Sequence, residues 1–292
     1  MTEDEHGTIF LEDARVLSHT SLPGNHYCLR LKATSIAARA HPGSFVHVRC
    51  DESLPMRRPM SIMGADAQAS WIEVLYRVVG KGTHLLSRKA PAEMISLLGP
   101  IGKPFAFSDD VKRPLLIGGG VGIPPLIFLA DRLRVRRGSH YPLFLAGSER
   151  PYPFPTQPSR IVVPGMPAGV IAGLAMLEEW GVPSRLATQQ GFAGCFDGYV
   201  TDLAQLVLSG LQGEQREEVT IFACGPLPML RRVTGLAQEW GVPCQVSLEE
   251  YMACAVGGCA GCVVAIETAA GPSMKRVCVD GPVFNGEQII WP

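Results

Sequence analysis

The sequence lacks a surplus of charge of either sign. Its 292 residues include 26 lysines and arginines and 27 aspartates and glutamates, so the net charge is -1 and the isoelectric point is near 6.7. No run of basic residues stands out. Without a positive field, a protein attracts neither the phosphates of nucleic acids nor an anionic membrane surface. We therefore expect no nucleic-acid partner.

Long apolar runs are also missing. No stretch approaches the roughly eighteen consecutive apolar residues that a transmembrane helix needs. The first residues, MTEDEHGTIFLED, are acidic, whereas a secretory signal peptide starts with basic residues and continues with an apolar segment. We therefore expect a cytoplasmic protein that is not inserted into a membrane.

The cytoplasm keeps thiols reduced, so disulfides explain the nine cysteines poorly. An odd number of cysteines also cannot all pair within one chain. Five of them are scattered and are interpreted as small buried hydrophobic residues: Cys28, Cys50, Cys195, Cys224 and Cys244. The other four lie together near the C-terminal end.

The chain is long enough for two domains and a small third module, and its 47% apolar residues supply their cores. Up to about Pro104, short runs with a period of two, such as WIEVLYRVVG, predict a small antiparallel barrel or sandwich. After Arg113, strand-like and helix-like segments alternate, which predicts a parallel sheet covered on both faces by helices. We expect a β-barrel domain at 1–106, an α/β domain at 107–244 and a glycine- and cysteine-rich module at 245–292.

Two local patterns within the predicted α/β domain concern prolines. The pentapeptide EWGVP occurs at 179 and 239, and each copy predicts a glycine cap after a helix and a proline before the next strand. Between Arg150 and Pro167, six prolines fall in PYPFPTQPSRIVVPGMP. This density predicts an irregular loop inserted into the domain.

The clustered cysteines have the spacing C-x4-C-x2-C-x15-C and are Cys254, Cys259, Cys262 and Cys278. Four thiolates can hold two irons bridged by sulfides, and the first three match the plant-type [2Fe-2S] spacing. The loop glycines would let backbone amides turn toward sulfur without clashes: Gly257, Gly258 and Gly261. One alternative is a structural zinc site, which favours two CxxC knuckles where this chain has one. Unligated thiols are the other.

Two glycine turns indicate a nucleotide site. The first, GGGVGIPP, follows a strand-like run and opens a helix, as in turns where a pyrophosphate meets free helix amides; its glycines are Gly118, Gly119, Gly120 and Gly122. A tight turn without a ligand is the alternative. The second, Cys224-Gly225-Pro226, follows the strand-like VTIFA. Parallel strands would place both turns at one edge and form a dinucleotide crevice.

A second pyrophosphate site is predicted in the first domain. RRPMSI contains Arg58 and Ser61, and the later GKGTHLL contains Gly82 and Thr83. An arginine fork and a hydroxyl beside a glycine turn could hold a pyrophosphate, with the backbone of Met60 beside a flat ring. A solvated turn is the alternative.

These segments occur in one order, and over nearly its whole length the chain resembles the ferredoxin-reductase-like flavoproteins. Within them it resembles the electron-transfer subunits of type B dihydroorotate dehydrogenase. In that family, stretches like RRPMSI and GKGT bind FAD, GGGVGIPPL and CGPLPML bind NAD, and EEYMACAVGGCAGC with VCVDGPVF holds a [2Fe-2S] cluster. The last combination is the most specific, because general ferredoxin reductases lack it.

The resemblance implies roles for individual residues. FAD would contact Arg58, Pro59, Met60, Ser61, Leu75, Tyr76, Arg77, Gly82 and Thr83. NAD would bind at the four glycines of the first turn and at Gly225 and Pro226, with Cys224 beside the nicotinamide as the catalytic-site residue. The four clustered cysteines would ligate the irons. Two positions beside the cluster depart from the family: Tyr251 replaces a basic residue and Ala255 replaces a glycine.

The resemblance also implies a function. Electrons would pass between an FMN-containing dihydroorotate dehydrogenase catalytic subunit and NAD, through the cluster and FAD, in pyrimidine biosynthesis. The assembly would be a heterotetramer of two such chains and two catalytic subunits. The alternatives are an NAD(P)H-dependent ferredoxin or sulfide reductase subunit with another redox partner, and a zinc-stapled nucleotide-binding regulator. NAD and NADP stay open, because LAGSERPYP offers both Glu149 and Arg150 to the ribose.

Overall fold

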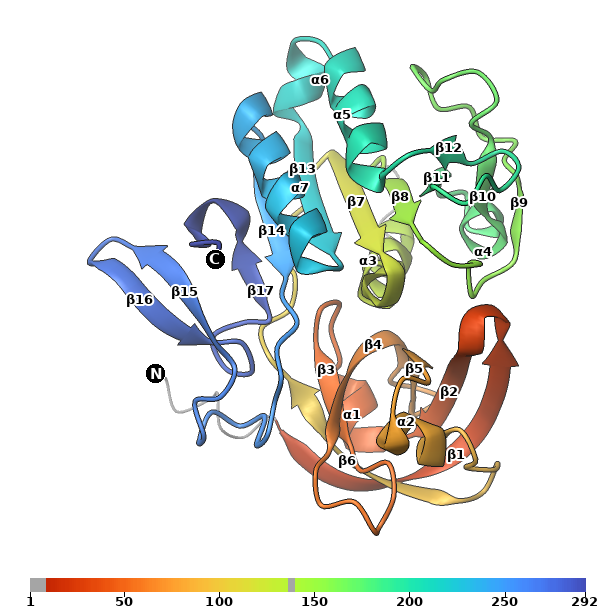
Figure 1. Ribbon diagram of the computed structural model, residues 1–292, viewed down its shortest axis with the longest axis vertical. Helices are drawn as coiled ribbons and strands as arrows, with labels where there is room; N and C mark the ends of the chain where they lie inside the picture. The colour runs from red at the N-terminus through yellow and green to blue at the C-terminus, as the bar shows by residue number, and fades with distance from the viewer. Residues whose placement is uncertain (1–8, 136–139) are drawn as a thin grey trace.

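The computed structural model describes residues 9–135 and 140–292, which form a closed barrel below an α/β sheet and a hairpin at the side (Figure 1). The predicted barrel and parallel-sheet architecture is therefore confirmed, and the sandwich alternative is not. Among the helices in these two ranges, none combines the length and the apolar character needed to cross a membrane.

The barrel consists of antiparallel strands in the order β1-β2-β5-β4-β3-β6. The strands are β1 (Phe10–Leu22), β2 (His26–Lys32), β3 (Phe45–Val48), β4 (Arg58–Asp66), β5 (Trp71–Arg77) and β6 (Met94–Ile101). Two short helices accompany them, α1 (Thr34–Arg39) and α2 (Lys81–Leu86), with a 3-10 turn at Pro23–Asn25. Alternate residues of β5, Ile72, Val74 and Tyr76, are buried in the barrel core, as their period of two predicts.

The α/β sheet has the strand order β12-β11-β8-β7-β13-β14-β17. These strands are β7 (Arg113–Gly119), β8 (Leu143–Gly147), β11 (Ser184–Thr188), β12 (Phe196–Asp197), β13 (Val219–Cys224), β14 (Cys244–Ser247) and β17 (Val283–Asn285). All neighbours are parallel except β14 and β17. Since most of these strands are buried on both faces, their sequences are apolar runs, as in LLI.

Helices cover both faces of this sheet (Figure 1). Helix α3 (Ile123–Val135) packs on one face with Leu116 and Phe222, whereas α5 (Val200–Gly210) and α7 (Leu227–Trp240) pack on the other with Leu115 and Ile221. Helix α3 also contacts β4 of the barrel and buries Leu75, which otherwise would face solvent. The two units therefore share an apolar interface.

Both EWGVP segments have the predicted structure. Gly181 follows α4 (Ala175–Glu179) with φ +72°, and Gly241 caps α7 with φ +64°. In each case the proline immediately precedes a strand, β11 or β14. These left-handed positions require glycine, which carries no Cβ.

The proline-rich segment is largely irregular, as predicted, but it contains one short strand and two buried aromatic residues. Its β9 (Thr156–Pro158) pairs with β10 (Ala172–Leu174), and Tyr152 and Phe154 are buried against the sheet. The Tyr152 hydroxyl lies 2.9 Å from the carbonyl of Ala146 and 2.8 Å from that of Ala187. Proline is tolerated because β9 is an edge strand, and the aromatic side chains supply the packing that the pattern did not indicate.

The C-terminal segment is joined to the α/β sheet at both ends. The predicted boundary at residue 245 falls inside β14, and β17 returns to pair with that strand. Between them lie the cysteine loop and a hairpin of β15 (Val263–Thr268) and β16 (Gly271–Arg276). The cysteine loop is thus anchored by main-chain hydrogen bonds to the sheet.

Candidate cofactor sites around the barrel and the sheet edge

The two predicted glycine turns meet at one edge of the sheet. Strands β7 and β13 are neighbours, and Cys224 pairs with Gly118 in their register. A Cβ on Gly122 would overlap the backbone of Cys224. A Cβ on Gly119 would lie 3.0 Å from Cδ of Pro226. The turns therefore pack backbone against backbone, which only glycine allows.

A cavity of about 650 Å³ runs along this edge. Its volume suits a small-molecule cofactor. Its lining from the first turn and the second turn includes Gly119, Gly120, Val121, Pro226, Pro228 and Met229. The ends of the other strands contribute Gly147, Ser148, Glu149, Arg150, Ala187, Thr188, Gln189, Gly198, Tyr199, Val200 and Thr201. The barrel contributes His26 and Arg77 from across the cleft.

Two residues of the barrel line this cavity, although the sequence did not predict either of them there. Arg77, predicted to contact FAD, lines the same cavity as Gly119 and Gly120. His26 was not predicted at all, because nothing in HYCLRLK distinguishes it from an ordinary strand residue. Burial lowers the pKa of His26, and the positive charges of Arg77 and Arg150 lower it further. The cavity wall therefore carries a local excess of positive charge, which suits an anionic group.

Cys224 ends β13, two residues before Pro226, which lines the cavity. Its side chain is fully buried, and this burial, followed by the nearby charge of Glu249, raises the pKa of its thiol far above the ordinary value. A hydrogen bond with Ser247 opposes the shift only in part. Cys224 is therefore a neutral thiol at physiological pH and can make contact without reacting as an anion.

The segments predicted to hold FAD come together at one end of the barrel. Arg58 begins β4, and a Cβ on Gly82 in α2 would lie 3.4 Å from its Nε atom. Thr83 orders the turn into α2, since its hydroxyl oxygen accepts from the amides of Val79 and Gly80 at 3.0 and 3.2 Å. The arginine therefore lies beside the glycine turn that Thr83 orders.

The remaining predicted FAD residues differ in exposure: Pro59 is exposed, whereas Met60, Leu75 and Tyr76 are at most 7% exposed. The Tyr76 hydroxyl lies 2.9 Å from Nε2 of His19, and its ring stacks on Tyr27 with centroids 5.7 Å apart. These contacts hold the Tyr76 side chain against other residues of the barrel.

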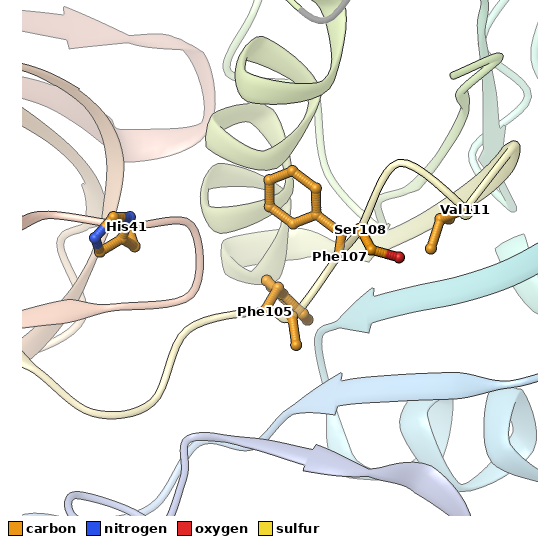
Figure 2. A pocket seen from close by; sticks show the side chains of 6 residues that line it. His41, Phe105, Phe107, Ser108 and Val111 are labelled. Atoms are coloured by element: carbon orange, nitrogen blue, oxygen red, sulfur yellow. The ribbon is translucent and has the colours of Figure 1, made fainter. Parts of the chain in front are cut away.

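A second cavity, of about 540 Å³, lies at the linker between the barrel and the sheet (Figure 2). Its lining comes from one barrel loop and the linker and comprises His41, Phe105, Ala106, Phe107, Ser108 and Val111. The amide of Ala106 donates to Oε1 of Gln245 at 2.9 Å, and Nε2 of Gln245 donates to the carbonyl of Ala106 at 2.6 Å. The linker is thereby attached to β14.

The four clustered cysteines approach one another as two pairs. The Cys254 thiol interacts with that of Cys259, and the Cys278 thiol interacts with that of Cys262 and more weakly with the charge of Cys254. Cys262 and Cys278 are 3% exposed, whereas Cys259 is exposed on the outer side of the loop. Within residues 9–135 and 140–292, no three histidine, cysteine, aspartate or glutamate side chains converge on one point as ligands of a single ion. Two pairs of thiolates match a cluster in which each of two irons takes two cysteines.

Backbone amides around the loop point at sulfur. Burial disfavours the thiolate of Cys254, but hydrogen bonds from the amides of Val256, Cys259 and Gly258 outweigh it and lower its pKa to about 7. The amide of Cys259 lies 3.4 Å from Sγ of Cys254. For Cys278, burial and the proximity of Cys262 raise the pKa to about 12, although the Gly257 amide opposes this. Amides that favour a thiolate also favour a thiolate-ligated metal.

Position 255, where this chain has alanine in place of the family's glycine, has a left-handed backbone. Ala255 has φ +56°, in the left-handed region that favours glycine, and its side chain is 1% exposed. Ala260 has φ +51° in the same loop. The other departure, Tyr251, is 95% exposed and disturbs no packing.

Comparison with known families agrees with the cysteine loop. The model described as "Iron-sulfur cluster binding domain of dihydroorotate dehydrogenase B" matches residues 249–290. This range contains all four clustered cysteines and the β15–β16 hairpin.

Curated relatives match over nearly the whole chain. The dihydroorotate dehydrogenase B (NAD(+)) electron transfer subunit of Desulforamulus reducens is 32% identical over 281 residues, covering 96% of this chain and 98% of that protein. The corresponding subunit of Geobacillus kaustophilus is 33% identical over 289 residues, with coverage of 96% and 98%.

Solved structures share the fold. An NADH-dependent reduced ferredoxin-NADP oxidoreductase, studied for flavin-based electron bifurcation, has a TM-score of 0.76 and 26% identity over 95% of this chain and 90% of that one. A ferredoxin reductase of carbazole 1,9a-dioxygenase has a TM-score of 0.63 at 19% identity, over 80% and 67% of the two chains. The flavoprotein fold, the iron-sulfur segment and the full-length relatives together show that this chain belongs to the family of dihydroorotate dehydrogenase B electron transfer subunits.

Proposed function

We propose that this chain carries electrons between NAD and an FMN-containing dihydroorotate dehydrogenase catalytic subunit, by way of FAD and a [2Fe-2S] cluster, in pyrimidine biosynthesis. The single observation that carries the proposal is that one chain combines two pairs of cysteine thiols in its C-terminal segment with a dinucleotide-sized cavity between barrel and sheet. FAD supplies the link, since it exchanges two electrons with a nicotinamide and single electrons with a cluster.

The cavity residues support an NAD site at the sheet edge. The amides of the first glycine turn lie at the start of α3, where an anionic pyrophosphate is favoured. Arg77 and His26 face this turn from the barrel. In the proposed function Arg77 neutralises the pyrophosphate, and the neutral thiol of Cys224 bounds the space for the nicotinamide without exchanging a proton.

The barrel residues support an FAD site beside the cavity. Arg58 would bind the FAD pyrophosphate with Gly82 and Thr83, whose turn lies beside the guanidinium. Pro59, Met60, Ser61 and Leu75 would offer backbone and side-chain edges to the flavin ring. The barrel would therefore orient the flavin toward the same cavity that Arg77 lines.

The cysteine loop supports an exit for electrons toward a protein partner. Cys254, Cys259, Cys262 and Cys278 would ligate the cluster. Cys259 lies at the surface, and Tyr251 and Val256, 95% and 49% exposed, flank the loop. We propose that the catalytic subunit docks here, in an assembly of two copies of each subunit.

For the nicotinamide cofactor we propose NAD over NADP. Glu149 follows β8, the strand next to β7, where an acidic residue pairs with the ribose hydroxyls of NAD and repels a 2′-phosphate. Glu149→Gln should then narrow the preference for NADH over NADPH by about tenfold in kcat/KM, equivalent to about 1.4 kcal/mol. Glu179→Gln removes the same charge at the end of α4 and should leave the preference unchanged. A Glu149→Gln variant with the original preference would contradict this assignment.

The experiment that tests the proposed function is an absorption spectrum of the anaerobically purified chain before and after NADH, with iron and acid-labile sulfide assays. Flavin bands and a cluster shoulder that bleach with NADH, at two irons per chain, are the expected result. Flavin without iron or sulfide would contradict the cluster assignment, and zinc analysis would then test the alternative ligand.

The structural likeness to a reduced ferredoxin-NADP oxidoreductase supports a second candidate, a reductase subunit with another redox partner. Co-expression with the FMN-containing subunit separates the two. A stable complex that reduces NAD with dihydroorotate supports the first candidate. A chain that reduces ferredoxin with NADH but forms no such complex supports the second.

A further inference from the structure

Arg276, at the end of β16, reaches the cysteine loop from 19 residues along the chain. Its Nη1 atom donates to the carbonyl oxygen of Gly257 at 3.2 Å. Gly257 has φ +81°, and a Cβ there would lie 2.7 Å from Cγ2 of Val279 and 3.1 Å from Nη1 of Arg276. The guanidinium therefore lies directly under the loop at a position that accepts only glycine.

Asp280 holds the arginine in this position. Its Oδ2 atom accepts from the Arg276 amide at 2.8 Å and lies 3.5 Å from Nε of the same residue. Both side chains are half-buried, 36% and 27% exposed. The carboxylate thus fixes one side of the guanidinium while the other side is directed at the Gly257 carbonyl.

The contact at Gly257 bears directly on the sulfurs. In a trans peptide the carbonyl and the N–H point in opposite directions, so anchoring the oxygen of Gly257 sets the direction of the Gly258 N–H. Gly258 is followed by Cys259, whose own N–H donates to Sγ of Cys254 at 3.4 Å. Anchoring Gly257 therefore fixes the stretch of loop between these two cysteines.

We propose that Arg276 is a positioning residue for the iron-sulfur cluster, which anchors the Gly257 carbonyl in the loop between Cys254 and Cys259 and places a positive charge beside that loop. This inference rests on the proposed function, because it requires the cluster. Hydrogen bonds to sulfur and local charge are two of the factors that set the potential of such a cluster. Residues that orient the ligands of a metal also slow its loss.

The test compares Arg276→Met with Lys275→Met in the full chain, purified anaerobically with its cofactors. Lys275 precedes Arg276 on β16, and alternation directs its side chain to the other face of the hairpin. The cluster potential is measured by a redox titration followed by electron paramagnetic resonance, and iron release is measured with a chelator. Arg276→Met should shift the potential to more negative values and speed iron release by roughly tenfold or more. Lys275→Met should change both much less.

Two further variants keep the inference testable if Arg276→Met assembles no cluster. Arg276→Lys retains the charge without the planar fork, and Asp280→Asn retains the arginine without its anchor. Both should release iron faster than the wild type, and Arg276→Lys should keep the potential closer to the wild-type value than Asp280→Asn does. The inference would be overturned if Arg276→Met kept the full cluster content, the wild-type potential and the wild-type rate of iron release. The same result in both Arg276→Lys and Asp280→Asn would also overturn it. A wild-type chain without iron and sulfide would instead refute the proposed function itself.

Discussion

The α-carbon of Gly122 lies against the backbone of Cys224, so close that a Cβ on the glycine would overlap the cysteine carbonyl. The two residues are 102 positions apart in the printed sequence, in the first and second glycine turns. Residues close to them in the chain, Val121 and Pro226, line the 650 Å³ cavity. The contact between Gly122 and Cys224 depends on neighbouring parallel strands that end at the same level.

Gly122→Ala should therefore destabilise the protein by about 1–3 kcal/mol, because the new methyl group forces backbone against backbone. The rate of flavin reduction by NADH should fall as well. Urea unfolding and stopped-flow absorbance measure the two effects. Gly235→Ala in α7 is the control: its nearest neighbour would be 3.9 Å away, and the loss of a helix-interior glycine should stabilise by about 1 kcal/mol. Equal effects of both variants would contradict the contact.

Arg58 and Arg57 should differ when each is changed to glutamine. Arg57 donates to the Ser96 carbonyl at 2.8 Å and to its hydroxyl at 2.9 Å, which ties β6 to the segment before β4. Arg57→Gln should lower the free energy of unfolding by about 1–3 kcal/mol. Arg58→Gln should instead weaken FAD binding by roughly 10- to 100-fold, the loss of one charged hydrogen bond. Equilibrium dialysis of FAD that fails to separate the variants would refute the assignment of Arg58.

His47 should make the stability depend on pH. It is 1% exposed, and neither ring nitrogen finds a partner with hydrogen-bond geometry in the described part of the chain. Burial, with the positive charge of Arg57, lowers its pKa from 6.5 to about 4, although carbonyls at Met252 and Arg57 oppose the shift. The unfolded chain therefore takes up a proton near pH 6.5 that the folded chain refuses until about pH 4, and stability falls as the pH falls through this window.

The loss should be at most about 3 kcal/mol and is measured by urea unfolding at pH 7 and at pH 4.5. His47→Leu should flatten the pH dependence in this window. His41→Gln, at an exposed position before β3, should not. An unchanged slope in His47→Leu would show that another group is responsible.

The two left-handed alanines of the cysteine loop should respond differently to glycine. Ala260→Gly relieves a strain of about 1 kcal/mol at an exposed position. Ala255→Gly relieves the same strain but removes a buried methyl group worth about 0.8 kcal/mol, so its net effect should be near zero. Thermal unfolding of the protein with its cofactors measures both changes. A larger gain for Ala255→Gly would contradict the burial of its side chain.

Local rules were sufficient where neighbouring residues decide the structure. The alternation in WIEVLYR predicted β5, and both EWGVP segments predicted a left-handed glycine before a strand. The proline-rich segment is largely irregular, as predicted, but the sequence did not indicate β9 or the burial of Tyr152 and Phe154, which depends on strand ends far away in the sequence. Arg77 was expected only at FAD, since sequence patterns do not report that barrel and sheet share a cavity.

By itself, the sequence determined the barrel, the parallel sheet, the four-cysteine spacing and the family resemblance, since these depend on periodicity, turn chemistry and motif order. Only the tertiary structure decided which residues meet across the fold. His26 reaches the dinucleotide cavity, the cysteines form two pairs, and Arg276 supports Gly257. Such contacts join residues that the chain keeps far apart, and they exist only once packing has brought separate elements to one place.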